Sequence, residues 1–118
     1  RNIKTFIMDS KVVVGVGNIY ASESLFLAGI SPKRISGKTS KNRYKILTKS
    51  IKKILADAIN NGGTTLNDFS NVDGSPGYFS QVLSVYDREN MPCVTCSVKI
   101  KRIVQNQRAT YYCPKCQN

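Results

Sequence analysis

The chain has 118 residues, enough for one ordinary domain or two very small ones. Its 18 Lys and Arg residues against 7 Asp and Glu give a formal charge of +11, and 41% of its residues are hydrophobic. The hydrophobic content excludes a disordered chain, and no apolar run approaches the ~20 residues of a membrane helix. The charge favours a polyanionic partner, most often nucleic acid. A basic protein from a lysine-rich proteome is the alternative.

The first elements in the chain are short. Residues 2–8 predict the end of a helix. Asn18 is a candidate N-cap for a second helix that runs to about Ala28. Gly29 is its expected C-terminal stop, and Pro32 follows shortly after.

A longer helix is the clearest prediction. Thr39 or Ser40 is expected to cap its start, and Gly62-Gly63 to end it. Its apolar residues recur at three- and four-residue spacing and are Tyr44, Leu47, Ile51, Ile54, Leu55, Ala58 and Ile59. The opposite face carries Lys41, Lys45, Lys49, Lys52 and Lys53. A lysine face of this kind is usually solvated, and the alternative is a binding surface.

Residues 62–79 lack periodicity and are rich in Gly, Thr, Asn, Asp and Ser. Loops of this length inside a compact chain tend to be functional or disordered. A short helix or strand is expected near 79–85, and 87–92 is a polar linker into a cysteine-rich tail.

The tail contains the strongest motif, two Cys-x-x-Cys pairs separated by sixteen residues: Cys93, Cys96, Cys113 and Cys116. This spacing predicts one structural Zn²⁺ ion held by four thiolates, with no open position for catalysis. Two disulfides are the alternative, but they need an oxidising compartment, and no secretory signal is recognised. With little core to bury in the tail, the metal should supply most of its folding energy.

Between the two cysteine pairs, residues 98–104 and 108–112 are rich in Val, Ile, Thr and Tyr. With the polar residues 105–107 between them, they predict a β-hairpin. The tail from Cys93 carries five cations and no acidic residue. Such a hairpin is suited to contact phosphates.

Gly15 and Gly17 form a glycine-rich turn that leads into the helix at Asn18. Turns of this kind can hold phosphate at a helix N-terminus. The third glycine of the dinucleotide fingerprint is absent, and so is the P-loop lysine. A DNA phosphate is therefore a better candidate than a nucleotide, and a purely structural turn is the alternative.

Three segments together are specific: residues 15–23 (GVGNIYASE), the loop 62–79 with GGTTL and DGSPGYF, and residues 107–116 (QRATYYCPKC). In this order they closely resemble bacterial formamidopyrimidine-DNA glycosylase, and the resemblance covers essentially the whole chain. It implies an enzyme that excises oxidised purines, such as 8-oxoguanine and formamidopyrimidines, and then cleaves the abasic strand. The glycine-rich loop favours this branch over the related one that prefers oxidised pyrimidines.

The resemblance implies a mainly α fold: a helix–two-turn–helix domain over about 1–86, followed by a four-cysteine zinc-finger β-hairpin over about 87–118. The family's catalytic residues are an N-terminal proline, which forms a Schiff base with the sugar, and the adjacent glutamate. This chain begins Arg1-Asn2, and its first proline is Pro32. We therefore expect the C-terminal part of such an enzyme, inactive alone, whose N-terminal catalytic domain is its partner.

The resemblance assigns DNA contacts to three residues. Asn18 matches an asparagine that holds phosphate near the lesion, and Arg108 matches an arginine that grips the phosphates beside the flipped nucleotide. Lys4 matches a lysine near the active site, with a surface lysine as the alternative. The segment that closes over the everted base is matched by Thr64, Thr65, Leu66, Asn67, Asp68 and Phe69.

The implied partner is double-stranded DNA with oxidised bases or abasic sites. The implied intact enzyme is a monomer in the bacterial cytoplasm, associated with the nucleoid and not with a membrane. A stand-alone zinc-ribbon module that binds nucleic acid without catalysis is the main alternative. A structural domain whose charge is incidental is a third possibility, which the ordered motifs disfavour.

Overall fold

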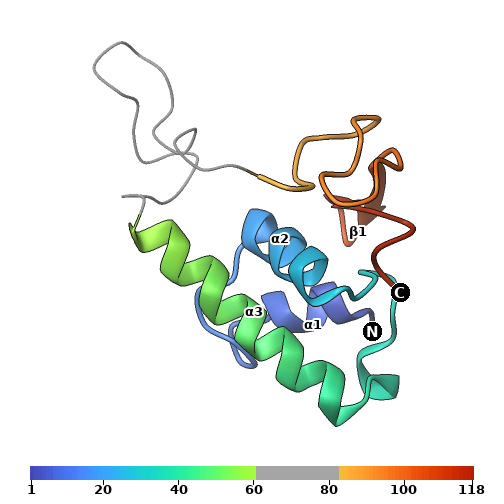
Figure 1. Cartoon of the computed structure of the whole chain (residues 1–118). Coiled ribbons are helices and arrows are strands. Elements are labelled where there is room, and N and C mark those ends of the chain that lie inside the picture. The colour runs from blue at the N-terminus through green and yellow to red at the C-terminus, as the bar shows by residue number, and fades with distance from the viewer. Residues whose placement is uncertain (61–82) are drawn as a thin grey trace.

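The computed structural model describes residues 1–60 and 83–118 (Figure 1). The elements are α1 (Ile3–Met8), α2 (Asn18–Ala28), the 3₁₀ turn η1 (Ser36–Lys38), α3 (Lys41–Asn60), β1 (Lys101–Gln105) and β2 (Arg108–Tyr112). Helices with one antiparallel hairpin confirm the expected mainly α fold. Within the two described ranges, no helix is both long and apolar enough to cross a membrane.

Three predictions fall wholly or partly outside these ranges. The helix stop at Gly62-Gly63 and the base-capping segment Thr64–Phe69 lie outside the described residues. So does most of the element expected near 79–85, and residues 83–85 form neither helix nor strand.

Helix α2 has the predicted length, but Asn18 is not its N-cap. Asn18 is the first helical residue, and Gly17 occupies the cap position without a side-chain hydrogen bond. The Asn18 amide is instead turned towards Lys4 and the hairpin, so tertiary contacts replace the local cap. At the other end, Gly29 adopts φ 72° and closes the helix as predicted.

Helix α3 begins where the sequence predicts, because the Ser40 hydroxyl accepts a hydrogen bond from the Arg43 N–H at 3.2 Å. Leu47, Ile51 and Ala58 are buried, but Ile59 is 76% exposed, and its assignment to the apolar face was wrong. Successive helical residues are turned by about 100°. Ile59 therefore points well away from Ala58, which occupies the buried stripe.

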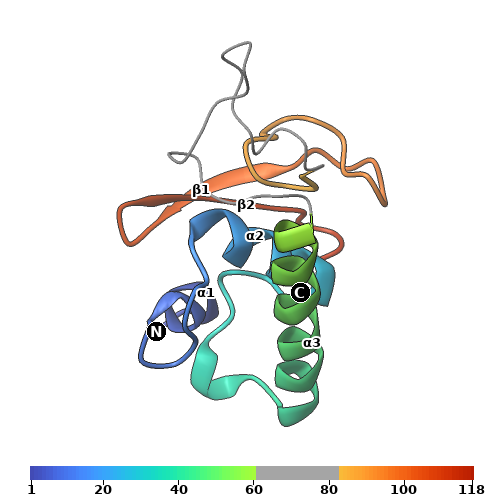
Figure 2. The same ribbon diagram turned by 90° about the vertical axis from the view of Figure 1, so that its left-hand side faces the viewer.

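The hairpin pairs β1 with β2 in antiparallel register, with Gln105 opposite Arg108. Its two-residue turn has positive φ at both Asn106 (51°) and Gln107 (67°), as a tight hairpin turn requires. The first strand is shorter than expected and starts at Lys101. Figure 2 shows the hairpin lying across the helices on the side of α2.

Two apolar clusters form the interior, and α2 contributes to both. The helical cluster consists of Ile3, Ile7, Val16, Ala21, Leu25, Ile30, Leu47 and Ile51. The cluster around the metal site consists of Val85, Cys93, Ile100, Tyr111 and Cys113. Leu25 belongs to the first cluster and its neighbour Phe26 packs against the second, so α2 joins the helices to the zinc tail.

Candidate nucleic-acid interface and metal centre

The four cysteines converge at one point. The sulfur atoms of Cys93, Cys96, Cys113 and Cys116 all lie within 4.8 Å of one another. The Cys93–Cys116 sulfur distance is 3.9 Å, and the Cys96–Cys113 distance is 3.4 Å. Tetrahedral ligands at Zn–S distances of about 2.3 Å lie about 3.8 Å apart. The donor set and its spacing therefore fit one zinc ion.

The thiols themselves favour a cation at this point. Burial opposes the ionisation of Cys93, but the backbone N–H groups of Cys96 and Thr95 lower its pKa to about 7. Burial, and then the three neighbouring sulfurs, raises the pKa of the Cys116 thiol to about 12. Four thiolates cannot share this space without a positive charge among them, and a divalent ion supplies that charge.

A second convergence joins α1, α2 and β2 at Lys4. Its side chain is only 2% exposed. The ammonium donates to the Asn18 Oδ1, to the Thr110 Oγ1 at 2.6 Å and to the Ala109 carbonyl at 3.3 Å. The Asn18 amide also donates to the Ala109 carbonyl at 3.0 Å. Two sequence-predicted residues, Lys4 and Asn18, thus meet beneath the hairpin.

The Lys4 ammonium loses its proton more easily in this position than in water. Burial, and then the nearby Arg108 guanidinium, lowers the pKa of Lys4 from 10.5 to about 8. Its hydrogen bonds run on through Thr110, whose hydroxyl donates to the Gln105 side chain at 3.2 Å. Gln105 in turn donates to the Pro32 carbonyl at 3.0 Å. Sequence reasoning overlooked Thr110, which looks like an ordinary strand residue, and assigned Gln105 to the hairpin turn, whereas it is the last residue of β1.

Arg108 stands at the start of β2, directly after the hairpin turn, and is exposed. The structure gives its guanidinium no hydrogen-bond or ion-pair partner within residues 1–60 and 83–118. Because both residues of the preceding turn have positive φ, the backbone direction at Arg108 is fixed. Arg108 therefore presents an exposed fork of N–H donors next to the hairpin turn, with no partner in the described part of the chain.

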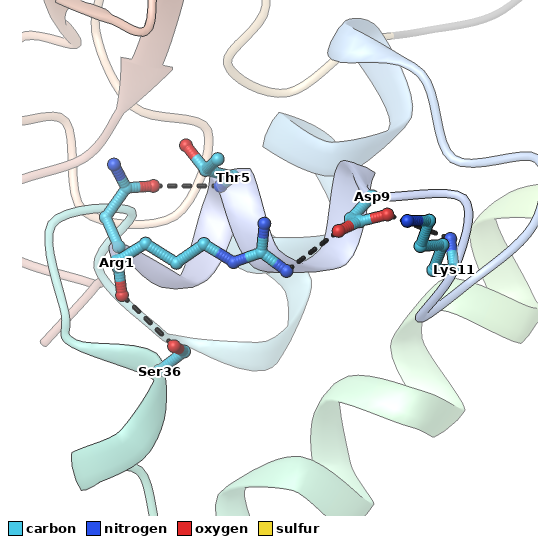
Figure 3. A network of polar contacts seen from close by, with 6 residues as sticks. Arg1, Thr5, Asp9, Lys11 and Ser36 are labelled. Atoms are coloured by element: carbon cyan, nitrogen blue, oxygen red, sulfur yellow. Dashed lines mark hydrogen bonds and ion pairs between the residues drawn. The ribbon is translucent and has the colours of Figure 1, made fainter.

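A cavity of about 290 Å³ lies between α1 and the tip of the hairpin. It is lined by Arg1, Lys4, Thr5, Met8, Asp9, Gln105, Asn106 and Arg108. Figure 3 shows Arg1 reaching along α1 to Asp9, with 2.9 Å between the guanidinium and the carboxylate. The Lys11 N–H, and then Arg1, lowers the pKa of Asp9. Arg1 thus has a carboxylate partner, whereas Lys4 and Arg108, the other cations that line this cavity, have none among the described residues.

The N-terminal wall of the cavity is tied to residues 34–36, which lead into η1. The Ser36 hydroxyl donates to the Arg1 carbonyl at 3.1 Å, as Figure 3 shows. The Ile3 N–H donates to the Arg34 carbonyl at 2.7 Å. These contacts, with the side-chain cap that Asn2 provides for the Thr5 N–H, hold α1 at a fixed orientation.

Glu23 is a buried carboxylate that sequence reasoning did not single out. It is 4% exposed and accepts hydrogen bonds from three successive backbone N–H groups, those of Ser84, Val85 and Tyr86, at 2.7 to 3.0 Å. The contact fastens residues 84–86, which precede the cysteine-rich tail, to the middle of α2. The partners lie more than 60 residues away in sequence, so no local signal could have revealed them.

Comparison with known proteins matches residues 1–70 to the formamidopyrimidine-DNA glycosylase H2TH domain. The chain belongs to the formamidopyrimidine-DNA glycosylase family. Residues 92–118 match the zinc finger found in FPG and IleRS. With the clustered sulfurs, this match shows that the four cysteines hold a structural zinc ion. The helical match also argues against a stand-alone zinc ribbon.

Relatives agree along the whole chain. It is 68% identical over 117 residues to formamidopyrimidine-DNA glycosylase from Ruthia magnifica subsp. Calyptogena magnifica, with 99% of this chain and 44% of that protein covered. The corresponding protein of Vesicomyosocius okutanii subsp. Calyptogena okutanii is 62% identical over the same shares. The chain therefore spans less than half the length of these curated relatives.

Solved structures of the family show the same fold. The MutM (Fpg) protein from Thermus thermophilus is 39% identical with a TM-score of 0.86, and the match covers 99% of this chain and 45% of that one. A complex between Lactococcus lactis Fpg and DNA containing an abasic site is 34% identical, also with a TM-score of 0.86, and the match covers 100% and 42%. The backbone fold of this chain therefore matches that of the family as closely as its sequence does.

Proposed function

We propose that this chain is the DNA-binding and zinc-finger part of a bifunctional DNA glycosylase and AP lyase that excises oxidised purines. The observation that carries the proposal is the meeting of Lys4 and Asn18 beneath a hairpin that presents the unpaired Arg108. Family membership supplies the reaction class, and a related structure contains DNA with an abasic site.

Each anchor has a distinct physical task. An enzyme that acts on a base within a duplex must extrude that base, and extrusion needs firm contacts with the backbone. Arg108 offers two parallel N–H donors to a phosphate, a geometry that lysine lacks. Asn18 lies at the positive N-terminal end of α2, where anions are favoured. Lys4 holds Asn18 against the hairpin and adds charge to the cavity wall.

The catalytic groups are proposed to lie outside this chain, in the N-terminal catalytic domain of a longer protein. By the family resemblance, catalysis requires an N-terminal proline and an adjacent glutamate, and this chain matches only 44% of the length of its Ruthia magnifica relative. We therefore expect no base excision by the chain alone. The intact enzyme would act as a monomer on nucleoid DNA in the bacterial cytoplasm. The base-capping role of Thr64–Phe69 stays a prediction.

The proposal is tested by titrating the zinc-loaded chain into a labelled duplex with a stable abasic-site analogue, at several salt concentrations. The expected result is binding that weakens with salt, and an Arg108→Ala variant whose salt slope is smaller by about one. A duplex without the lesion and an Arg102→Ala variant, which removes an exposed β1 cation, serve as controls. Absence of binding, or an Arg108→Ala variant identical to the parent, would remove the main support for the proposal.

A further inference from the structure

Helix α3 carries a groove of about 480 Å³ that shares no lining residue with the cavity beside Arg108. It is lined by Lys41, Tyr44, Lys45, Thr48, Lys49 and Lys52. All four lysines are exposed, and no carboxylate lines the groove among residues 1–60 and 83–118. The groove is therefore a shallow, open strip along one face of α3 whose described lining carries one charge sign.

This charge is not balanced within the part of the chain that the structure describes. The ion pairs found there are Arg1–Asp9 and Lys53–Asp57, and neither includes a lysine of the groove. Asp57 is the only acidic residue of α3, and it lies beside Lys53, which does not line the groove. The four exposed lysines thus have no ion-pair partner among the described residues.

The position of these lysines also destabilises helix α3. Lys41 and Lys45, and again Lys45 and Lys49, are four residues apart on one face, where like charges repel. The first turn of α3 contains Lys41 and Arg43 and no acidic residue, although the N-terminal end of a helix favours negative charge. The Arg43 guanidinium has a hydrogen-bond acceptor, the Asn118 carbonyl oxygen at 3.0 Å. A bound polyanion would relieve the remaining repulsion.

We propose that the α3 groove binds a second stretch of duplex DNA phosphate backbone, separate from the one held beside Arg108. The inference rests on the proposed DNA-binding function. The twelve residues from Lys41 to Lys52 span eleven helical steps and so rise by roughly 16 Å along the helix, and a DNA strand carries one phosphate per ~3.4 Å of axis, so the stripe faces several phosphates. Lysines act on phosphate as flexible point charges, which suits contact independent of base sequence.

The test compares salt dependence for duplexes of about 30 base pairs, one undamaged and one with an abasic-site analogue. The variant is the triple substitution Lys45→Gln, Lys49→Gln and Lys52→Gln in the zinc-loaded chain. Each phosphate contact contributes a salt slope of about 0.9, so the slope should fall by about two to three. Affinity for both duplexes should fall by the same factor, because the groove does not contact the lesion. Glutamine has the helix propensity of lysine, and an unchanged melting temperature verifies folding.

Control variants distinguish failure of the groove proposal from failure of the proposed DNA-binding function. Lys53→Gln removes a cation of the same helix outside the groove and should leave the slope unchanged. An unchanged slope for the triple variant, with a reduced slope for Arg108→Ala, overturns the groove proposal and leaves the proposed function standing. A parent chain that does not bind DNA overturns both. A triple variant that loses binding to polyglutamate but not to DNA would point to an acidic protein, and it also overturns the proposal.

Discussion

The Lys4 ammonium lies 2.6 Å from the Thr110 hydroxyl, 106 residues further along the chain. This hydrogen bond joins the first helix to the second strand of the hairpin. Because Asn18 and the Ala109 carbonyl take the other donors of the ammonium, one buried side chain links α1, α2 and the hairpin. Lys4 is thus a structural joint within the proposed DNA interface.

Replacing Lys4 by Met keeps the length of the side chain but removes the donors. The Thr110 hydroxyl and the Asn18 carbonyl oxygen would each lose a buried charged partner. We expect the free energy of unfolding to fall by about 1–3 kcal/mol, measured by urea denaturation of the zinc-loaded chain. Lys11→Met, at an exposed position, should change it by less than about 0.5 kcal/mol. Equal stability of both variants would show that the junction contributes nothing.

The same lysine should make stability depend on pH in the alkaline range. The folded chain releases the Lys4 proton near pH 8, whereas the unfolded chain keeps it up to about pH 10.5. Between these values the unfolded state binds more protons, so the free energy of unfolding rises with pH. The difference between the parent and Lys4→Met should therefore grow from pH 8 to 10.5. A difference that stays flat or shrinks over this range would contradict the lowered pKa.

Local patterns in the sequence predict helix α3 and the hairpin well, because both rest on contacts between near neighbours. The three- and four-residue spacing of Leu47, Ile51 and Ala58 describes a face that is buried in the structure. Asn18 shows where such reasoning fails. Its local preference is to cap a helix, but the buried Lys4, fourteen residues earlier, offers its Oδ1 a charged donor. The stronger distant partner decides the orientation of the side chain.

Removal of zinc should unfold the apolar cluster of the tail and leave the helical cluster folded. The tail packs mainly around the cysteines, so chelation of zinc removes the link that holds Cys93 and Cys113 in its core. We expect the hairpin amide resonances to collapse in ¹H–¹⁵N spectra, while the cluster around Leu25 and Leu47 keeps much of the helical circular dichroism. Addition of Zn²⁺ should restore the spectrum, and Mg²⁺ should not. Unchanged hairpin resonances in metal-free protein would contradict a structural role for zinc.

Glu23→Gln tests the hydrogen bonds that hold the segment before the tail on α2. One Glu23 oxygen accepts the Ser84 N–H, and the other accepts those of Val85 and Tyr86. Glutamine retains one acceptor oxygen and places a donor where the second oxygen was. At least one buried N–H then lacks an acceptor, and we expect a loss of about 1–3 kcal/mol in unfolding free energy. The exposed Glu89→Gln is the matched control, with an expected change of less than about 0.5 kcal/mol.

Gly29→Ala probes the end of α2, where the chain turns under the zinc tail. The residue has φ 72° and ψ 27°, and an added Cβ would lie 3.5 Å from the Cys116 carbonyl, an ordinary contact. The penalty therefore comes from the left-handed backbone and not from a clash, and we expect about 1 kcal/mol of destabilisation. Gly37→Ala is the control, since its added Cβ meets nothing within 4 Å and its φ is not positive. If both alanines have the same effect on thermal unfolding, the left-handed cap does not limit the stability of α2.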